Sequence, residues 1–145
     1  MIEKAYDIIP ATIDVQAKLV IPSKILNTLI NSKRPKQLIL TRYIMPMQGY
    51  DSKVRCIRLF LPHKYRKFEH DIKASSSLTE EQMAAMTRSI FHSATRHHVS
   101  HTGEIKIQLH LSAYANLSGD VWFIRDERGI YLVSRPEPSL ITELT

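Results

Sequence analysis

Hydrophobic and polar positions alternate in several short stretches of the chain, and proline or glycine bounds most of them. In the stretch 18–21, Leu19 and Ile21 alternate with Lys18 and Val20, which is typical of a half-buried strand. Pro22 ends this strand because proline lacks the N–H that a strand ladder needs. Together with the residue that follows, it opens a predicted short helix with apolar positions at Ile25, Leu26, Leu29 and Ile30.

Further strands are predicted at 37–42, 54–61, 105–108, 121–124 and 130–133. Pro62 ends the second of these, and the segment 126–129 is a predicted hairpin turn between the last two. A short helix after the strand 105–108 is indicated by the helical spacing of Leu111, Tyr114 and Leu117. The segments 31–36 and 46–51 are predicted loops, and prolines at 136 and 138 predict an irregular tail.

Two helices are predicted between these groups of strands. The first covers 62–74 and carries Tyr65, Phe68 and Ile72 on one face. Thr79 and Gln82 form a predicted capping box for the second helix, which is expected to end near Ala94. Its apolar positions, expected to be buried, are Met83, Met86, Ile90 and Phe91. Exposed faces around Tyr65, Phe68 or Met83 are candidate contacts between subunits.

The pattern of turn, alternating strand and helix start occurs twice, at 13–25 and at 99–111. An internal duplication of this kind predicts two similar structural units in one chain. Each unit alone has too few strands to be stable. The two units must therefore pair within the chain, and pairing between chains is also possible.

The chain has 145 residues, of which 43% are hydrophobic, enough for one core or for two smaller cores that lean on each other. Its single cysteine, Cys56, cannot form an intrachain disulfide and is expected to be a buried strand residue. The sequence shows no secretory signal and no apolar run of about 18 residues. We therefore expect a cytoplasmic protein that does not span a membrane.

The formal net charge of +6 suggests a polyanionic partner, although the same excess also keeps a protein soluble. The distribution of charge favours a partner, because no acidic residue lies between Asp14 and Asp51. The cations in this stretch are Lys18, Lys24, Lys33, Arg34, Lys36 and Arg42. They predict a face that follows the phosphates of DNA, with a merely solvated surface as the alternative.

The order of turn, alternating strand, proline, short helix, strand and hairpin resembles the SpoVT/AbrB-type swapped-hairpin barrel, a DNA-binding half-barrel. Two copies separated by a pair of helices, over about this length, are similar to the MraZ family of bacterial transcriptional regulators. The resemblance implies an α+β fold with a first repeat at 5–62, a helical insert at 63–96 and a second repeat at 97–136.

The family motif is an Asp, three residues, a basic residue and an apolar strand that ends in proline. Asp14, Lys18 and Pro22 occupy these positions in the first repeat, with Lys18 where the family usually has Arg. Lysine offers a point charge in place of a planar fork, so we expect it to keep affinity and to lose some base reading. Asp14 is expected to accept backbone hydrogen bonds in the turn and so to orient Lys18.

The second repeat departs further from the motif. Ser100 stands in the place of the Asp, Glu104 replaces the basic residue and Gln108 replaces the proline, whereas Gly103 matches the family as a second turn-orienting residue. Lys106 completes the predicted DNA-binding set. Glu104 would repel phosphate if it faced DNA, although it could instead accept from a cytosine amino group or pair with a neighbouring subunit.

The resemblance implies binding to double-stranded DNA at repeated promoter sites of a cell-division and cell-wall gene cluster, by a nucleoid-associated homo-oligomer that could be a ring. One alternative is a degenerate ring-forming scaffold that works by protein–protein contact, and another is an AbrB-like antitoxin and autorepressor. The sequence shows no phosphate-binding glycine loop, nucleophile elbow or paired catalytic carboxylates, so we expect neither catalysis nor a cofactor. The histidines at 97, 98 and 101 lack the further ligands of a metal site, so none is expected.

Overall fold

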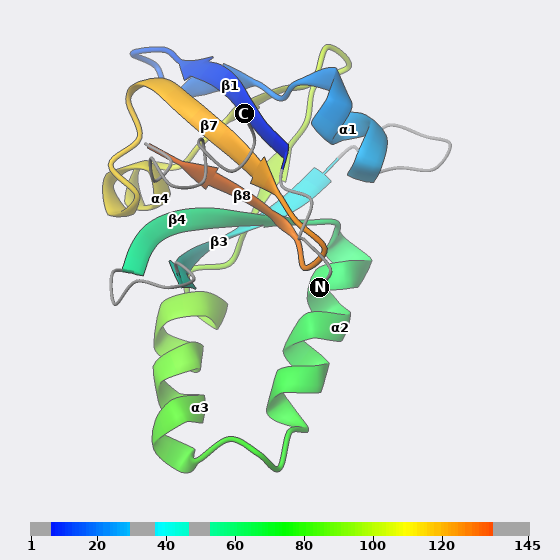
Figure 1. Ribbon diagram of the computed structural model, residues 1–145, viewed down its shortest axis with the longest axis vertical. Helices are drawn as coiled ribbons and strands as arrows, with labels where there is room; N and C mark the ends of the chain where they lie inside the picture. The colour runs from blue at the N-terminus through cyan, green and yellow to red at the C-terminus, as the bar shows by residue number, and fades with distance from the viewer. Residues whose placement is uncertain (1–6, 30–36, 47–52, 135–145) are drawn as a thin grey trace, which may run out of the picture.

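The computed structural model describes residues 7–29, 37–46 and 53–134. It is a mixed α+β structure in which an eight-stranded antiparallel sheet curls into a nearly closed barrel (Figure 1). The strands of the first half are β1 (Asp7–Ile13), β2 (Lys18–Val20), β3 (Gln37–Pro46) and β4 (Lys53–Phe60). Those of the second half are β5 (Thr95–His98), β6 (Glu104–Lys106), β7 (Gly119–Arg125) and β8 (Ile130–Val133).

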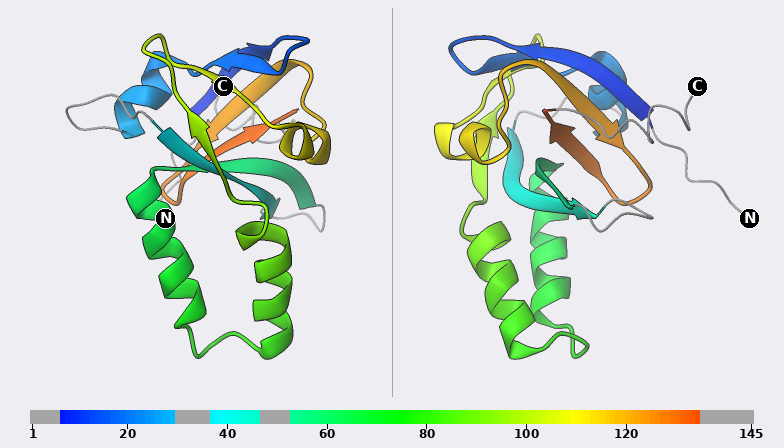
Figure 2. Two further views of the ribbon diagram at one scale, coloured as in Figure 1. Left: turned by 180° about the vertical axis from the view of Figure 1, so that it is seen from behind. Right: turned by 60° about the vertical axis from the view of Figure 1, so that its left-hand side comes forward.

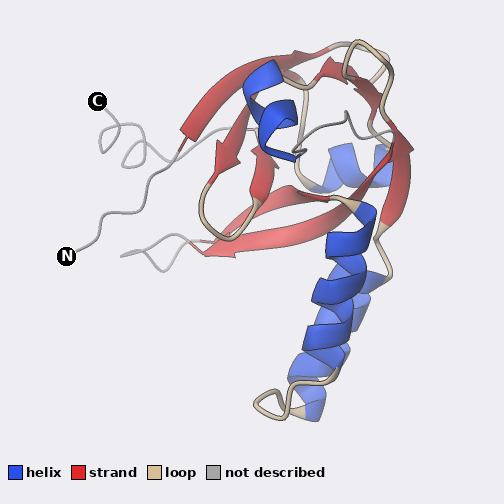
Figure 3. Ribbon diagram, turned by 90° about the vertical axis from the view of Figure 1, so that its right-hand side faces the viewer, coloured by secondary structure: helices blue, strands red, loops and turns tan. Residues whose placement is uncertain are grey.

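The helices are α1 (Ser23–Leu29), α2 (Pro62–Lys73), α3 (Glu80–Met86) and α4 (Leu109–Tyr114), and the last turn of the α3 segment, Thr87–Phe91, is a π-helix. The α2 and α3 helices form an arm that projects from the barrel, with α1 and β1 at the opposite end (Figures 1 and 3). The Thr79 hydroxyl accepts from the Gln82 N–H and the Gln82 side chain accepts from the Thr79 N–H, so the predicted capping box is confirmed.

The two halves of the chain exchange strands. The order in the sheet is β5-β3-β4-β8-β7-β1-β2-β6, so β1 of the first half pairs with β7 of the second, and β5 of the second pairs with β3 of the first. The strand β4 of the first half also pairs with β8 of the second, and β2 pairs with β6. Neither half could form this sheet alone, which agrees with the expectation that the two halves pair within the chain.

Hydrogen bonds in the two halves correspond closely. The Ala17 N–H donates to the Asp14 carbonyl over 3.0 Å, and the Gly103 N–H donates to the Ser100 carbonyl over 2.9 Å. Each turn also holds the other half, because Ile21 N–H donates to the Gly103 carbonyl and Ile107 N–H to the Ala17 carbonyl, both over 2.9 Å. The duplication in the sequence thus appears as a two-fold pattern of backbone hydrogen bonds.

The inward faces of the strands supply one core. Leu19, Ile105 and Phe123 are almost completely buried in it, together with side chains from α1 and α4. A separate hydrophobic cluster of Ile39, Phe60 and Tyr65 attaches α2 to the outer face of β3 and β4. Cys56 is fully buried on the outer face of β4, as expected, and half-buried Trp122 packs in the same outer cluster.

Several expectations about the elements need correction. The strand β1 was not predicted, since Pro10 lies within it; proline is tolerated there because β2 pairs with β1 only at Ile13 and leaves most of that edge open. The strand β5 was also missed, because Thr95–His98 carries two adjacent histidines and lacks an apolar alternation. On the second arm helix only Ile90 is buried, whereas Met83, Met86 and Phe91 are half-buried.

The two turns make the same demand on residues 17 and 103, a positive φ, but alanine occupies the first position and glycine the second. Replacing Ala17 (φ 62°) with glycine is expected to raise the free energy of unfolding by about 1 kcal/mol, since glycine has no Cβ to strain there. Gly103→Ala should lower it by about 2 kcal/mol, because φ is +85° and the new Cβ would lie 2.8 Å from Leu26 Cδ1. Urea unfolding of both variants checks this; equal responses would contradict the geometry.

Candidate nucleic-acid interface

The strands β2 and β6 form a short two-stranded ribbon at the end of the barrel away from the α2–α3 arm (Figure 2). Lys18 lies directly opposite Lys106, Leu19 opposite Ile105 and Val20 opposite Glu104. Leu19 and Ile105 point into the core, which leaves the other four side chains on the outer face. Local alternation therefore places both lysines on the surface, and the register brings them side by side.

The charge on this ribbon is unequal along its length. Lys18 and Lys106 place two cations at one end, while Glu104 beside exposed Val20 places an acid at the other. Under the two-fold pattern Glu104 occupies the position of Lys18, and Lys106 occupies that of Val20. The cation lost at position 104 is thus offset by one at position 106, on the half of the ribbon that already carries Lys18.

The turn before β2 is held by Asp14. Its Oδ1 accepts hydrogen bonds from the N–H groups of Gln16 and Lys18 at 2.8 and 2.9 Å, which are the backbone bonds expected of this residue. Its backbone N–H donates to the Lys18 carbonyl over 2.9 Å. Val15, at the tip, is fully exposed. The Asp14 carboxylate therefore accepts hydrogen bonds within the turn, and these bonds fix the backbone position of Lys18.

The turn before β6 uses a hydroxyl for the same purpose. Ser100 Oγ accepts from the Glu104 N–H over 2.9 Å, and the Ser100 N–H donates to the Glu104 carbonyl over 3.0 Å. Gly103 supplies the positive φ that this turn needs. The departure from Asp to Ser in the second motif thus keeps the shape of the turn and removes a negative charge from it.

The other predicted DNA-binding residues lie apart from this lysine pair. Lys24 on α1 is 3.4 Å from the Asp7 carboxylate, which also pairs with Arg125. Arg42 on β3 stacks on Tyr114 of α4 and takes no part in the ribbon. The predicted cations Lys33, Arg34 and Lys36 lie outside the described residues. Of the predicted set, the structure therefore brings together Lys18 and Lys106.

Arg58 on β4 is a buried cation that sequence reasoning did not single out. Its guanidinium carbon lies 4.7 to 5.5 Å from the centres of four rings, and its Nη2 donates to the Arg128 carbonyl over 2.8 Å. The rings are those of Tyr43, Phe60, Phe68 and Tyr131. The alternation of the strand could place Arg58 outward, but four rings from four different elements could not be anticipated from it.

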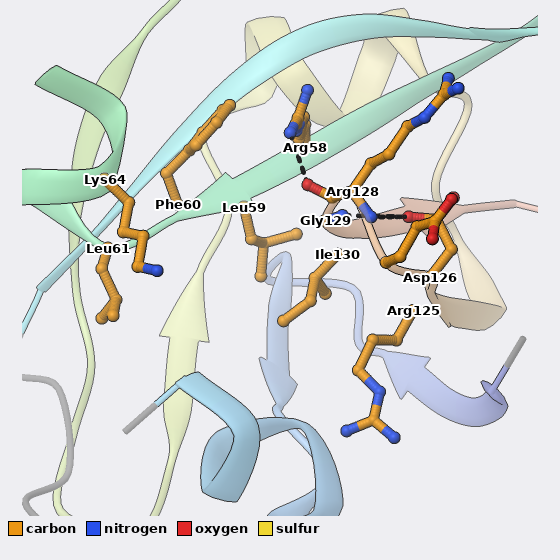
Figure 4. Close-up of a pocket in the computed structure, with 11 residues that line it drawn as sticks. Arg58, Leu59, Phe60, Leu61, Lys64, Arg125, Asp126, Arg128, Gly129 and Ile130 are labelled. Carbon is orange, nitrogen blue, oxygen red and sulfur yellow. Dashed lines mark hydrogen bonds between the residues drawn. The ribbon is translucent and has the colours of Figure 1, made fainter. Parts of the chain in front are cut away.

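A pocket of about 280 Å³ lies next to Arg58, where the β7–β8 hairpin approaches the start of α2 (Figure 4). Leu59, Leu61 and Ile130 give it apolar walls, and Lys64 and Arg125 add positive charge. The acidic side chains of Asp126 and Glu127 line the pocket as well. Asp126 Oδ1 accepts hydrogen bonds from the N–H groups of Arg128 and Gly129, as expected for the predicted hairpin turn.

Among the histidines considered for a metal, His97 has a structural role. Its Nδ1 lies 3.1 Å from the Thr95 carbonyl, and its Nε2 accepts from the Gln108 N–H at 3.3 Å, which requires a neutral ring with the proton on Nδ1. Burial lowers the pKa of His97 below its usual 6.5, and nearby His110 acts in the same direction, partly offset by the bond to Thr95. The ring thus joins β5 to the residue before α4.

This arrangement predicts a loss of stability in acid. Because the folded-state pKa of His97 is lowered, an unfolded chain binds a proton here at a pH where the folded chain does not. The contribution is therefore complete above pH 6.5 and declines as the pH falls below it. Urea unfolding at pH 7.5 and 5.5 measures the effect, and His97→Gln should make the free energy of unfolding less dependent on pH. An unchanged dependence in that variant would contradict the role given to His97.

In the described part of the chain, no three His, Cys, Asp or Glu side chains lie together as they would around a metal ion. None of the described helices is both long and apolar enough to cross a membrane. No protein-family model matches the chain, and no curated protein matches it. The geometry of the site is therefore the basis for the functional argument.

Proposed function

We propose that the protein is a DNA-binding transcriptional regulator of the MraZ type, built from two SpoVT/AbrB-like repeats that complete one barrel. The exchange of β1 and β5 between the halves supports this proposal, because swapped strands are what the repeat type requires. The matching turns at Asp14 and Ser100 support it as well. Such a protein would act at promoter DNA in the nucleoid.

The observation that carries the proposal is the pair formed by Lys18 and Lys106 on the exposed side of a two-stranded ribbon. A ribbon of this kind fits the major groove of B-DNA, which is about 12 Å wide. The two ammonium groups would contact phosphates at the edge of the groove, and Val15 and Gln16 at the tip of the turn would lie nearest the bases. Glu104 makes the other end of the ribbon unfavourable for phosphate contact.

A short ribbon with two cations gives weak binding, so we infer that the protein binds repeated sites as a homo-oligomer, for which the family resemblance suggests a ring. Several weak contacts held on one assembly multiply into a useful affinity. The half-buried Phe68 and Met83 of the arm are candidate subunit contacts. Tyr65 is not one, contrary to the sequence-based expectation, because it is buried against Phe60 and its hydroxyl donates to Glu69.

Salt dependence of DNA binding tests the proposal. Fluorescence anisotropy would follow binding to a duplex from upstream of the protein's own gene cluster, and to a shuffled duplex of the same composition, between about 50 and 200 mM salt. We expect tighter binding to the native duplex and an affinity that falls steeply with salt. Equal, weak binding to both duplexes at every salt concentration would contradict sequence-specific regulation.

A second candidate function is a ring-forming scaffold, and the exposed Val20 beside Glu104 favours it, because an apolar and acidic patch suits a protein partner better than DNA. Sedimentation of the purified protein distinguishes the two functions when it is combined with the DNA titration. A scaffold would form oligomers and would not bind DNA, whereas a regulator would form oligomers and bind DNA.

A further inference from the structure

Two arginines on neighbouring strands converge on one tyrosine at the end of the barrel that α4 covers. Arg42 on β3 lies opposite Ile57, and Arg55 on β4 lies opposite Ile44, so the two arginines are diagonal neighbours on one face of the sheet. Their guanidinium carbons lie 5.1 and 5.3 Å from the centre of the Tyr114 ring. Figure 1 shows α4 beside these two strands.

Neither guanidinium has an acidic partner among the described residues. The ion pairs that the described chain forms involve Asp7, Glu69 and Asp71, all in other parts of the structure. Arg42 Nε is buried and has no hydrogen-bond acceptor within the part of the chain that the structure describes. Arg55 is exposed, and its side chain stacks on Tyr114. Two like charges that stack on the same ring without a described counter-charge repel each other, and an anion bound to both would relieve that repulsion.

The tyrosine adds a third donor. Burial raises the pKa of Tyr114, and the two arginines oppose that change only in part, so the hydroxyl keeps its proton at neutral pH. The cluster therefore presents two guanidinium forks and one O–H donor.

We propose that Arg42, Arg55 and Tyr114 form a binding site for a phosphate-type oxyanion, separate from the β2–β6 ribbon. A carboxylate matches one guanidinium fork, whereas a phosphate has enough oxygens to accept from two forks at once. The phosphate could belong to a small molecule or to the backbone of a nucleic acid, and both present the same oxygens. The site does not depend on the function proposed for the ribbon.

The side-chain Nε–Hε groups of arginine, observed by two-dimensional ¹H–¹⁵N NMR, report directly on this site. Inorganic phosphate would be added to the full chain at constant ionic strength, with chloride as the balancing anion. We expect the Arg42 and Arg55 signals to shift along a saturating curve, and Arg55→Gln to weaken the apparent affinity at least tenfold. Arg55 is exposed, so this variant should remain folded, which an unchanged far-ultraviolet circular dichroism spectrum would verify.

Arg88→Gln is the matched control, because Arg88 is an exposed arginine of the projecting arm. It should leave the phosphate titration unchanged. A Lys18→Gln variant should also retain the phosphate shifts, so a failure of the ribbon to bind DNA is distinguishable from a failure of this site. A short duplex of unrelated sequence is the second ligand, and shifts with duplex but not with inorganic phosphate would assign the site to the phosphodiester backbone.

Two results would overturn the proposal. One is the absence of a saturable shift at Arg42 and Arg55 with both ligands. The other is a titration of Arg55→Gln that matches the unsubstituted protein, since the shifts would then arise from ionic strength or from another site.

Discussion

Arg58→Ala is expected to lower the free energy of unfolding by about 3 to 5 kcal/mol. The side chain is 9% exposed and lies against four aromatic rings, so its removal leaves a cavity between the sheet and α2. It also removes a charged hydrogen bond to the Arg128 carbonyl, which holds the β7–β8 hairpin. Urea unfolding followed by circular dichroism measures the loss.

Two further variants identify the source of the stabilisation by Arg58. Arg58→Lys keeps the charge and loses the planar group that stacks on the rings, so it should recover only part of the stability. Arg88→Ala removes an exposed arginine from the arm and should change the free energy of unfolding by less than about 0.5 kcal/mol. A loss below about 1 kcal/mol for Arg58→Ala would show that the stacked rings stabilise the fold without the cation.

The double variant Lys18→Ala/Lys106→Ala is expected to weaken DNA binding by about a hundredfold at low salt, since each lost phosphate contact accounts for about a factor of ten. The slope of log K against log salt should fall by about 2, because two fewer counterions are released for each protomer bound. Anisotropy titrations over a range of salt concentrations give both quantities.

Glu104→Gln is the informative companion to that double variant. Glu104 lies on the same ribbon but at its other end, so removal of its charge should strengthen DNA binding rather than weaken it. Lys67→Ala, on the remote α2 helix, should leave binding unchanged. If all three changes weakened binding equally, general destabilisation of the protein would explain the effect better than contact with phosphates.

The sequence indicated the ribbon strands, the arm helices and the hairpin at 126–129 because each depends on local signals. Leu19 and Ile105 alternate with less buried neighbours, and Thr79 with Gln82 forms a capping box, so neighbours in the sequence suffice. The strand β1 lacked such a signal, because Pro10 interrupts its apolar run and its place in the sheet depends on pairing with distant β7.

The candidate sites needed the three-dimensional arrangement. Lys18 and Lys106 were both expected to contact DNA, but their direct opposition depends on the register of β2 with β6. The rings around Arg58 come from β3, β4, α2 and β8, and Tyr114 reaches Arg42 only because α4 packs against the sheet. Long-range register and packing set these contacts, and neither is encoded in local periodicity.

The most direct test of the central claim is a titration of DNA from upstream of the protein's own gene cluster with the unsubstituted protein and with Lys18→Ala, at low and physiological salt. The geometry of the ribbon predicts specific, salt-dependent binding that Lys18→Ala weakens at least tenfold and Lys67→Ala leaves unchanged. Absence of specific binding at both salt concentrations, or equal binding by Lys18→Ala, would contradict the assignment of the β2–β6 ribbon as the DNA-binding surface.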